Sequence, residues 1–225
     1  MKDKAIVLGA GQGLGSALCK KLSEEGYEVI GINRSLGNDE GIGHRFQADL
    51  SDSEHTKALL QKMLTEFGTP QVVIHNTAQL LIKPFLETSE QDYFQVWQST
   101  SQSLFSAMQV LLPAMVRAGQ GTVIVSGATA SLRGGSDFSA FASAKFALRG
   151  LTQSLAREFQ PQGIHIAHVL LDGIIDTVRS RELHSLDASQ MMLSDDIASQ
   201  YLNLIRQPSS TWTHELDLRP SGERF

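Results

Sequence analysis

The 225-residue sequence predicts an α/β fold, with a doubly wound, mainly parallel sheet of about seven strands and helices on both faces. Short apolar runs alternate along the chain with longer amphipathic stretches. The apolar runs are nearly continuous, as in strands that are buried on both faces. No long linker, repeat or low-complexity stretch interrupts this alternation, so we expect one domain over residues 1–225.

The strands are expected where aliphatic and β-branched residues cluster between glycine, proline or polar residues. A glycine-rich segment follows the first of these runs directly, which is typical of a strand that turns into a helix. In chain order, the expected strands are residues 5–9, 27–32, 44–50, 71–75, 122–127, 163–171 and 214–220.

The helices are expected in the amphipathic stretches between these strands. The first places Leu14, Leu18 and Leu22 at helical spacing and ends at Gly26, a residue that suits a helix C-terminus. In the second, Ser51 or Ser53 is a candidate N-cap. In chain order, the expected helices are residues 14–26, 51–68, 90–117, 138–159 and 195–206.

Composition excludes several classes of protein. A hydrophobic content of 41% and a charged content of 19% describe an ordinary globular protein. The net charge of −5 argues against a nucleic-acid partner, because such proteins present basic faces to phosphates. The single cysteine, Cys19, excludes an intrachain disulfide and suits a reducing compartment. With no signal-peptide pattern and no long apolar run, we expect a cytoplasmic protein without a membrane partner.

The segment GAGQGLG, residues 9–15, lies at the turn from the first strand into the first helix. A doubly wound sheet binds a dinucleotide at this turn, because the glycines let the backbone approach a pyrophosphate at the helix N-terminus. The spacing Gly9, Gly13, Gly15 has the form G-x-x-x-G-x-G, while Leu14 stands where a G-x-G-x-x-G pattern from Gly9 and Gly11 needs its third glycine. All five residues are therefore candidate cofactor contacts.

Over nearly its whole length the chain resembles the short-chain dehydrogenase/reductase family, whose fingerprint has this glycine spacing. The resemblance implies a Rossmann-like fold and an oxidoreductase acting on a small carbonyl compound or alcohol. It also implies a homodimer or homotetramer formed through the helices at 90–117 and 138–159. The matches outside the glycine loop are ADL with Asp49 and Leu50, Asn76 in HNTA, Lys145 in SAFASAK, and Gly173 and Thr177 in DGIIDT.

Three residues after the second strand bear on the choice of nicotinamide cofactor. An NAD-specific site usually carries an acidic residue there for the ribose 2′-hydroxyl, but this chain has Asn33, followed by Arg34 and Ser35. A guanidinium pairs well with a 2′-phosphate, whereas a carboxylate repels it. We therefore expect NADP(H) to be preferred, with NAD(H) possible.

The catalytic positions of the family are mostly replaced. In the family, a Tyr exchanges a proton with the substrate while a Lys four residues later lowers its pKa, assisted by a Ser and an Asn. Carried over, these positions are Phe141, Lys145, Ala128 and Thr100, so Lys145 alone persists. The resemblance also gives this Lys a second role, in which it bonds the hydroxyls of the nicotinamide ribose.

Two readings of the altered site stay open. In one, another group supplies the proton, with Ser126, Ser143, Ser131 or a water molecule held by Lys145 as candidates. In the other, the chain is a catalytically silent NADP(H)-binding sensor or partner-binding protein.

Three further features are weaker signals. His165 and His168 lie three apart in an expected strand and so face opposite ways, which makes them a poor metal pair; no metal site is expected. Asp172 replaces a family Pro beside the expected nicotinamide position and is either a base or, as we favour, a turn cap. By resemblance, residues 178–194 form a short substrate-covering region, in which Arg179 and Arg181 are expected to be solvated.

Overall fold

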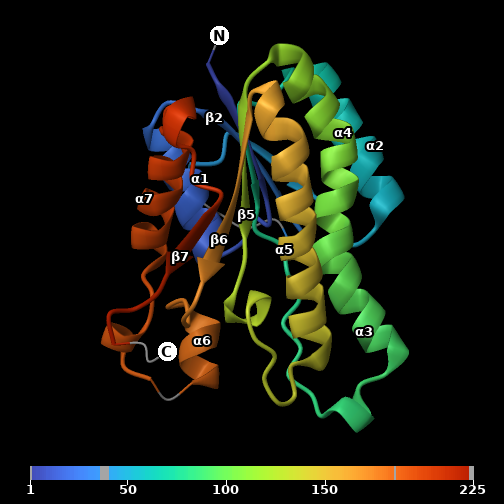
Figure 1. The fold of residues 1–225 in the computed structure, drawn as a ribbon, viewed down its shortest axis with the longest axis vertical. Helices are drawn as coiled ribbons and strands as arrows, with labels where there is room; N and C mark the ends of the chain where they lie inside the picture. Colours follow the sequence, from blue (N-terminus) through green and yellow to red (C-terminus); the bar gives the residue numbers. More distant parts are fainter. Residues whose placement is uncertain (1, 36–40, 185, 223–225) are drawn as a thin grey trace.

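A parallel sheet runs through the middle of the molecule and has helices against both faces (Figure 1). The computed structural model describes residues 2–35, 41–184 and 186–222. Within these ranges the strands are β1 (Lys4–Leu8), β2 (Glu28–Asn33), β3 (His44–Gln47), β4 (Val72–His75), β5 (Gly121–Ser126), β6 (Ile164–Leu171) and β7 (Glu215–Leu218). Their order is β3-β2-β1-β4-β5-β6-β7 and each pairing is parallel, which confirms the predicted doubly wound sheet.

The helices form two layers. Helices α2, α4 and α5 cover one face of the sheet, and α1 and α7 cover the other (Figure 1). The α-helices are α1 (Leu14–Glu24), α2 (Ser53–Phe67), α3 (Glu90–Trp97), α4 (Ser103–Ala118), α5 (Ser139–Phe159), α6 (Val178–Leu183) and α7 (Ser194–Ile205). The short helices are η1 (Phe85–Glu87), the π-helix η2 (Gln98–Gln102), η3 (Thr129–Ser131), η4 (Gln160–Gln162), η5 (Ala188–Gln190) and η6 (Ser209–Thr211).

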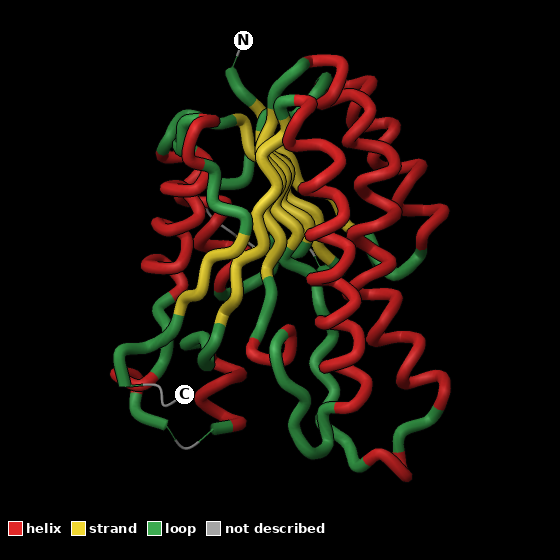
Figure 2. Tube along the Cα trace, in the orientation of Figure 1, coloured by secondary structure: helices red, strands yellow, loops and turns green. Residues whose placement is uncertain are grey.

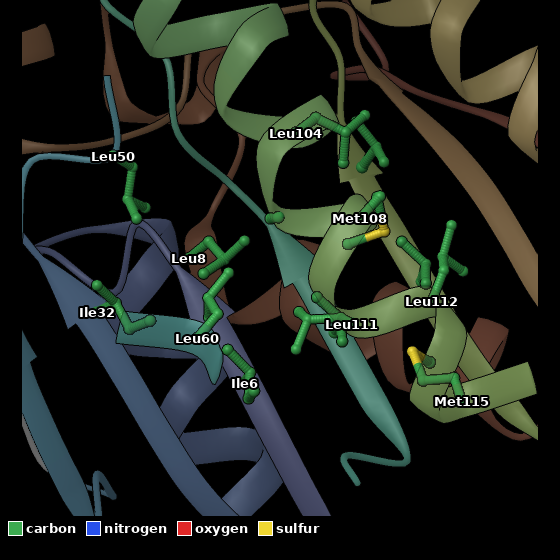
Figure 3. Close-up of a cluster of buried hydrophobic side chains, with 14 of the residues drawn as sticks. Ile6, Leu8, Ile32, Leu50, Leu60, Leu104, Met108, Leu111, Leu112 and Met115 are labelled. Atoms are coloured by element: carbon green, nitrogen blue, oxygen red, sulfur yellow. The ribbon is translucent and has the colours of Figure 1, made fainter. Parts of the chain in front are cut away.

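Each layer buries its own apolar cluster against the sheet. Figure 3 shows part of the larger cluster, where Leu60 of α2 and Met108 of α4 meet Ile6 and Leu8 of β1. These side chains are at most 2% exposed. Burying an aliphatic side chain of this size stabilises a fold by roughly 1.5–3 kcal/mol. The near-continuous apolar strands of the sequence thus reflect a sheet that is covered on both faces.

Two predicted elements and one predicted helix cap differ from the structure by more than a shift of one or two residues at an end. The helix predicted at 90–117 consists of α3, the π-helical turn η2 and α4. The strand predicted at 44–50 ends at Gln47, although the backbone N–H of Ala48 still donates a hydrogen bond to the carbonyl oxygen of Asn33 at 3.0 Å. Neither predicted serine caps α2, because the carboxylate of Asp52 accepts a hydrogen bond from the backbone N–H of His55 at 3.0 Å.

The order of the strands creates a crevice at the carboxyl ends of β1 and β4. The chain builds β1, β2 and β3 toward one edge and then returns to place β4 on the other side of β1. The connections that leave the carboxyl ends of β1 and β4 therefore diverge, and ligands of doubly wound sheets bind in such a crevice. In Figure 2 the loops after β5 and β6 extend below the sheet on this same side, together with α6. Among the described residues, no helix is long and apolar enough to cross a membrane.

Candidate functional site

The glycine turn forms a narrow cradle at the start of α1. Gly9 and Gly13 have positive φ angles of 88° and 84°, which glycine adopts without strain. A Cβ atom on Gly9 would lie 2.7 Å from the carbonyl oxygen of Asn76, and one on Gly15 would lie 2.2 Å from the carbonyl oxygen of Gly9. Both distances are too short for a side chain. The turn therefore requires glycine at these positions.

The N-terminus of α1 suits an anion. Gly13 is the N-cap residue, so no side chain bonds the first backbone N–H groups, and the first turn carries no acidic residue. Such uncapped N–H groups attract phosphate oxygens, helped by the helix dipole. Leu14, which was a candidate cofactor contact, is a core residue with 5% exposure, so its side chain packs against the sheet.

The glycine turn also gathers predicted residues from three other segments. A Cβ atom on Gly11 would lie 2.8 Å from Nδ2 of Asn33, and one on Gly13 would lie 2.8 Å from Cγ2 of Thr177. Asn76 donates a hydrogen bond to the carbonyl oxygen of Gly9 at 3.2 Å. The structure thus brings the ends of β2 and β4 and the start of α6 around one turn.

A polar cleft of about 520 Å³ opens from this turn along the ends of β1, β2 and β4. Of the predicted contacts it contains Gly9, Gly11, Asn33, Arg34, Asp49, Leu50 and Asn76. The sequence reasoning missed several other lining residues. Ser51, Thr77 and Gln79 lie in the loops that follow strands, whereas Gln95 lies on α3 and Ser99 lies in η2.

Asp49 is ionised in this cleft. Burial raises the pKa of its carboxyl group, but hydrogen bonds from the backbone N–H and hydroxyl of Ser51 and the nearby charge of Arg34 outweigh burial and lower the pKa overall. The Ser51 hydroxyl bonds Asp49 at 2.7 Å. Arg34 and Ser35 are exposed beyond β2, where Asn33 donates a hydrogen bond to the carbonyl oxygen of Ser35 at 3.2 Å.

A second, mainly apolar pocket of about 700 Å³ adjoins the polar cleft, and the two share Asn76 and Ala78. Predicted residues that line this apolar pocket are Ser126, Phe141, Lys145, Gly173 and Thr177. Its apolar walls come from Leu80, Ile82, Phe138, Leu171, Ile174, Ile175 and Leu186. The two hollows adjoin at these shared residues, with a polar lining on one side and a mainly apolar lining on the other.

Lys145 is a buried cation in the apolar pocket. The residue is 4% exposed, and its ammonium donates a hydrogen bond to the main-chain oxygen of Ser126 at 2.9 Å. Burial lowers the pKa of this amine to about 8. The ammonium lies 5.7 Å from the centre of the Phe141 ring, so the predicted sharing of one helix face by these two residues is observed.

The hydroxyl group of Ser126 is engaged by a residue of α7. It shares a hydrogen bond of 2.8 Å with the hydroxyl of Tyr201 on α7, and both groups are buried. Burial raises the pKa of Tyr201 well above its ordinary value, against the opposing effect of the Ser126 hydrogen bond. The sequence reasoning missed Tyr201, which reaches the site from the opposite layer of helices.

The other predicted serine donors are engaged as well. Ser143 lies on α5 and donates to the carbonyl oxygen of Ala140 at 2.9 Å, within its own helix. The hydroxyl of Ser131 accepts a hydrogen bond from the backbone N–H of Ala128 at 3.2 Å. Ala128, at the family's Ser position, contributes only a methyl group to the apolar pocket.

Thr100, at the family's Asn position, lies in the π-helical turn η2. Its hydroxyl is buried and has no hydrogen-bond partner among the described residues. The next residue, Ser101, donates to the carbonyl oxygen of Ala144 at 2.6 Å and so ties this turn to α5, one residue before Lys145.

Asp172 is the centre of a charged network rather than the simple turn cap we favoured. It is 2% exposed and accepts a hydrogen bond from the Thr129 hydroxyl at 2.6 Å. Its carboxylate oxygens lie 3.6 Å from Nη2 of Arg133 and 3.3 Å from Nη1 of Arg219. Thr129 and Arg133 both line the apolar pocket, and Arg133 is a second site residue that the sequence reasoning missed.

The two histidines of β6 are structural. His165 stacks on Trp212 with ring centroids 5.0 Å apart, and His168 is buried. Burial lowers the pKa of His165, and it lowers the pKa of His168 to about 4. Across residues 2–35, 41–184 and 186–222, no three His, Cys, Asp or Glu side chains are grouped to hold a metal ion.

Comparison with known proteins identifies the family. The family model for short chain dehydrogenases matches residues 3–187. A short-chain dehydrogenase/reductase of Armillaria gallica is 30% identical over 176 residues, which are 72% of this chain and 67% of that protein. The solved structure of a short-chain dehydrogenase from Rhodopseudomonas palustris is 32% identical, covers 97% of this chain and 98% of its own, and has a TM-score of 0.81.

A further solved structure, of a Tyr→Phe variant of ElxO with NADPH bound, has the same fold at 22% identity. Its TM-score is 0.87, and the alignment covers 96% of this chain and 97% of ElxO. The family model covers most of the chain, and two relatives share 30% and 32% of their residues with it, so the similarity is one of sequence as well as of fold. The chain belongs to the short-chain dehydrogenase/reductase family.

Proposed function

We propose that this chain is an NADP(H)-dependent oxidoreductase that reduces a carbonyl group and takes the required proton from Lys145 instead of a Tyr. The observation that carries this proposal is that the polar cleft adjoins the apolar pocket, which Lys145 lines. A polar cleft alone serves a nucleotide-binding protein. The adjoining apolar pocket provides room for a second molecule beside the reactive end of the nucleotide.

The residues present fit a nicotinamide dinucleotide. The glycine cradle, which a Cβ atom would fill, and the uncapped N-terminus of α1 suit the pyrophosphate. By the family resemblance, Asp49 contacts the adenine, Lys145 the nicotinamide ribose and Thr177 the carboxamide. Bound NADPH supplies a hydride, and the protein must then provide the proton that the reduced oxygen takes up.

Arg34 favours the 2′-phosphate of NADP(H) over the free hydroxyl of NAD(H). It lines the polar cleft and is exposed, so its guanidinium can meet a phosphate without losing a buried partner. Asn33 occupies the position where an acidic residue would repel that phosphate. NAD(H) remains a usable cofactor in this proposal, with weaker binding.

Lys145 is the proton donor because the alternatives are engaged elsewhere. Ser143 bonds within α5, Ser131 accepts from a backbone N–H, and Ser126 is paired with Tyr201. A neutral hydroxyl is in any case a weak acid near pH 7. An ammonium with a pKa of about 8 is mostly charged at pH 7 and is a much stronger acid than water, so it can protonate the substrate oxygen directly or through one water molecule.

A second function has its own support. Phe141 and Ala128 place a ring and a methyl group where the family uses hydroxyl groups, and both line the apolar pocket. A silent NADP(H)-binding protein, in which the apolar pocket receives an effector or a partner, is consistent with these replacements. The solved ElxO variant, which has the same fold, binds NADPH although one of its tyrosines is replaced by Phe.

The chain is also proposed to work in the cytoplasm as a homo-oligomer, with residues 178–194 covering the substrate. Side chains of α6 and of the segment after it, including Ser180, His184 and Leu186, line the apolar pocket; residue 185 lies outside the described residues. The outer surfaces of α4 and α5 carry half-exposed Phe105 and Phe146, which a second copy would cover.

The decisive experiment combines cofactor binding with turnover. NADPH and NADH binding are measured by fluorescence, and NADPH oxidation is followed with a panel of aldehydes and ketones. Lys145→Met is compared with Lys62→Met, the same replacement at an exposed position of α2. We expect tighter NADPH binding, measurable wild-type turnover, and a loss of roughly 10²-fold or more in Lys145→Met alone.

Three results would count against this function. Failure to bind either nucleotide would exclude both candidate functions. Tight binding without turnover on any carbonyl compound would favour the silent binder. Turnover that is equal in Lys145→Met and Lys62→Met would remove Lys145 from the proton transfer.

A further inference from the structure

The apolar pocket is larger and more apolar than a small carbonyl compound requires. Its volume of about 700 Å³ is in the range of sites for drug-sized ligands, even after the nicotinamide ring takes its share. Several of its lining side chains remain partly exposed, with Leu80 at 38%, Ile82 at 49% and Leu186 at 39%. A ligand with a bulky hydrocarbon part would cover this surface and gain free energy from its burial.

One strong cation lines this mainly apolar pocket besides Lys145. Arg133 lines the pocket and its side chain is 53% exposed. Its guanidinium approaches Asp172 at 3.6 Å, which is an ion pair but is longer than a hydrogen bond. Within the part of the chain that the structure describes, this is the only polar contact of the Arg133 side chain. Its N–H donors are therefore available to a ligand.

Asp172 holds Arg133 through a long ion pair and has two further partners of its own, so the N–H donors of Arg133 stay available to a ligand. The carboxylate is 2% exposed, and its two oxygens also receive the Thr129 hydroxyl at 2.6 Å and the Arg219 guanidinium at 3.3 Å. Arg219 is in turn paired with Asp217. A buried carboxylate needs such partners, since an unpaired one would be strongly destabilising. The network holds the Arg133 side chain beside the pocket.

Two other arginines of this part of the molecule are paired with acidic partners. Arg181 makes two hydrogen bonds of 2.6 Å to Asp176, and Arg149 makes bonds of 2.7 and 2.8 Å to Glu215. Such bidentate pairs occupy the planar edge of the guanidinium that a ligand carboxylate would use. Arg133 differs from both because its edge is not occupied in this way.

We propose that Arg133 binds an anionic group of the substrate, so that the preferred substrates are apolar carbonyl compounds that carry a carboxylate. This inference rests on the proposed function for the identity of the carbonyl substrate, but the binding of the carboxylate does not require turnover. The hydrocarbon part lies against the apolar walls, and the guanidinium pairs with the carboxylate. Arg133 is then a specificity-determining residue.

The test compares a phenyl-substituted keto acid, 5-oxo-5-phenylpentanoate, with its uncharged methyl ester. Binding of each is measured by calorimetry on the protein with NADP⁺ present, so that no reduction occurs, and again without nucleotide. The variants are Arg133→Gln, Arg133→Lys and, as the control, Arg179→Gln, which changes an exposed arginine of α6. Circular dichroism and thermal unfolding establish that each variant is folded.

We expect the keto acid to bind wild type about tenfold or more tightly than the ester, since charge-assisted hydrogen bonds are the strong ones. Arg133→Gln should abolish this preference, Arg133→Lys should keep part of it, and Arg179→Gln should leave it unchanged. The preference should also weaken as salt concentration rises.

Equal binding of acid and ester to wild type would overturn the proposal, as would a preference that survives Arg133→Gln. Loss of the preference in His184→Gln, a change in another residue lining the pocket, with Arg133→Gln unaffected, would move the anion site and also overturn it. The two failures are distinguishable: Arg133-dependent binding without any turnover would contradict the reductase function alone, and turnover without acid preference would contradict this inference alone.

Discussion

The ammonium of Lys145 donates a hydrogen bond to the main-chain oxygen of Ser126 at 2.9 Å, while the side chain of Ser126 is held by the hydroxyl of Tyr201. Lys145 comes from α5 on one face of the sheet, Tyr201 comes from α7 on the other, and Ser126 ends the strand β5 between them. Both helix layers therefore fix the position of the ammonium. It does not depend on a tyrosine at position 141.

Removal of the Tyr201 hydroxyl should destabilise the protein. Tyr201→Phe leaves the buried Ser126 hydroxyl without this partner, and such a loss costs about 1–2 kcal/mol in the free energy of unfolding. Ser126→Ala should cost a similar amount, but the double variant should cost clearly less than the two changes added together. Urea unfolding of the four proteins measures this coupling, and strict additivity would show that the hydrogen bond contributes nothing.

The pH dependence of reduction should report the amine of Lys145. As proton donor, the amine must be charged, and burial lowers its pKa to about 8. The rate of carbonyl reduction should therefore be level below this pH and fall as pH rises through about 8, and the rate of alcohol oxidation should rise over the same interval. NMR of protein labelled with ¹³C at the lysine ε position gives the amine pKa independently.

Lys145→Arg provides the control for this profile, because a guanidinium stays charged throughout the range. The fall near pH 8 should disappear in that variant. A profile that is identical in wild type and Lys145→Arg would assign the proton to a different group.

The sequence predicted the features of the site that depend on local pattern. Each of these features depends on residues that lie close together in the sequence. They are the glycine spacing, the pattern of each strand and helix, and the shared face of Phe141 and Lys145. Ser143 illustrates a signal that was available but not used. It lies two residues from each of these positions, and residues two apart on a helix point to nearly opposite sides, so it had to face away from the pocket.

The features that the sequence did not predict are contacts between distant segments. Ser126 and Tyr201 are separated by 75 positions, and Asp172 meets Thr129, 43 positions away. No periodicity marks such pairs, since they depend on how helices and loops pack on the finished sheet. The prediction of the α2 N-cap was wrong for another reason. Ser51, Asp52 and Ser53 all have suitable side chains, and the residue at which the helix begins determines which of them is the cap.

Phe141→Tyr should increase reduction if the rest of the family's machinery is intact. The new hydroxyl would stand near the Lys145 ammonium, which lies 5.7 Å from the centre of the present ring and would lower the phenol pKa. A positioned general acid raises rates by roughly 10²–10⁴-fold. Single-turnover NADPH oxidation measures the gain; the control Phe138→Tyr places a hydroxyl on a neighbouring ring of the same pocket. Equal effects of the two changes would argue against a specific proton role.

Arg34→Ala should change the choice of cofactor. Loss of the guanidinium removes a charge-assisted contact to the 2′-phosphate, and such contacts contribute about 1.5–3 kcal/mol. NADPH binding should weaken by roughly tenfold or more, while NADH binding changes little. Fluorescence titrations with both nucleotides provide the measurement, and Arg45→Ala, at an exposed arginine of β3, is the matched control. A parallel loss for NADPH and NADH would contradict the 2′-phosphate role.

Acid should destabilise the protein through His75 at the end of β4. The imidazole is fully buried and shares a hydrogen bond of 2.8 Å with the hydroxyl of Ser103. Burial, assisted by the charge of Lys145, lowers its pKa from 6.5 to about 3. Below pH 6.5 His75 becomes protonated in the unfolded chain, whereas in the folded protein it stays neutral until about pH 3. The free energy of unfolding should therefore fall across this interval, by about 4–5 kcal/mol for this one group.

His75→Gln separates this contribution from that of other groups. Glutamine does not titrate here and keeps a polar group that can bond Ser103. Wild type and His75→Gln both retain His168, whose pKa burial lowers to about 4 and which destabilises in the same direction. The difference between their unfolding free energies, measured in urea from pH 7 to pH 3.5, should therefore change steadily in favour of the variant as the pH falls. A difference that is constant with pH would mean that His75 is protonated as readily in the folded protein as in the unfolded chain.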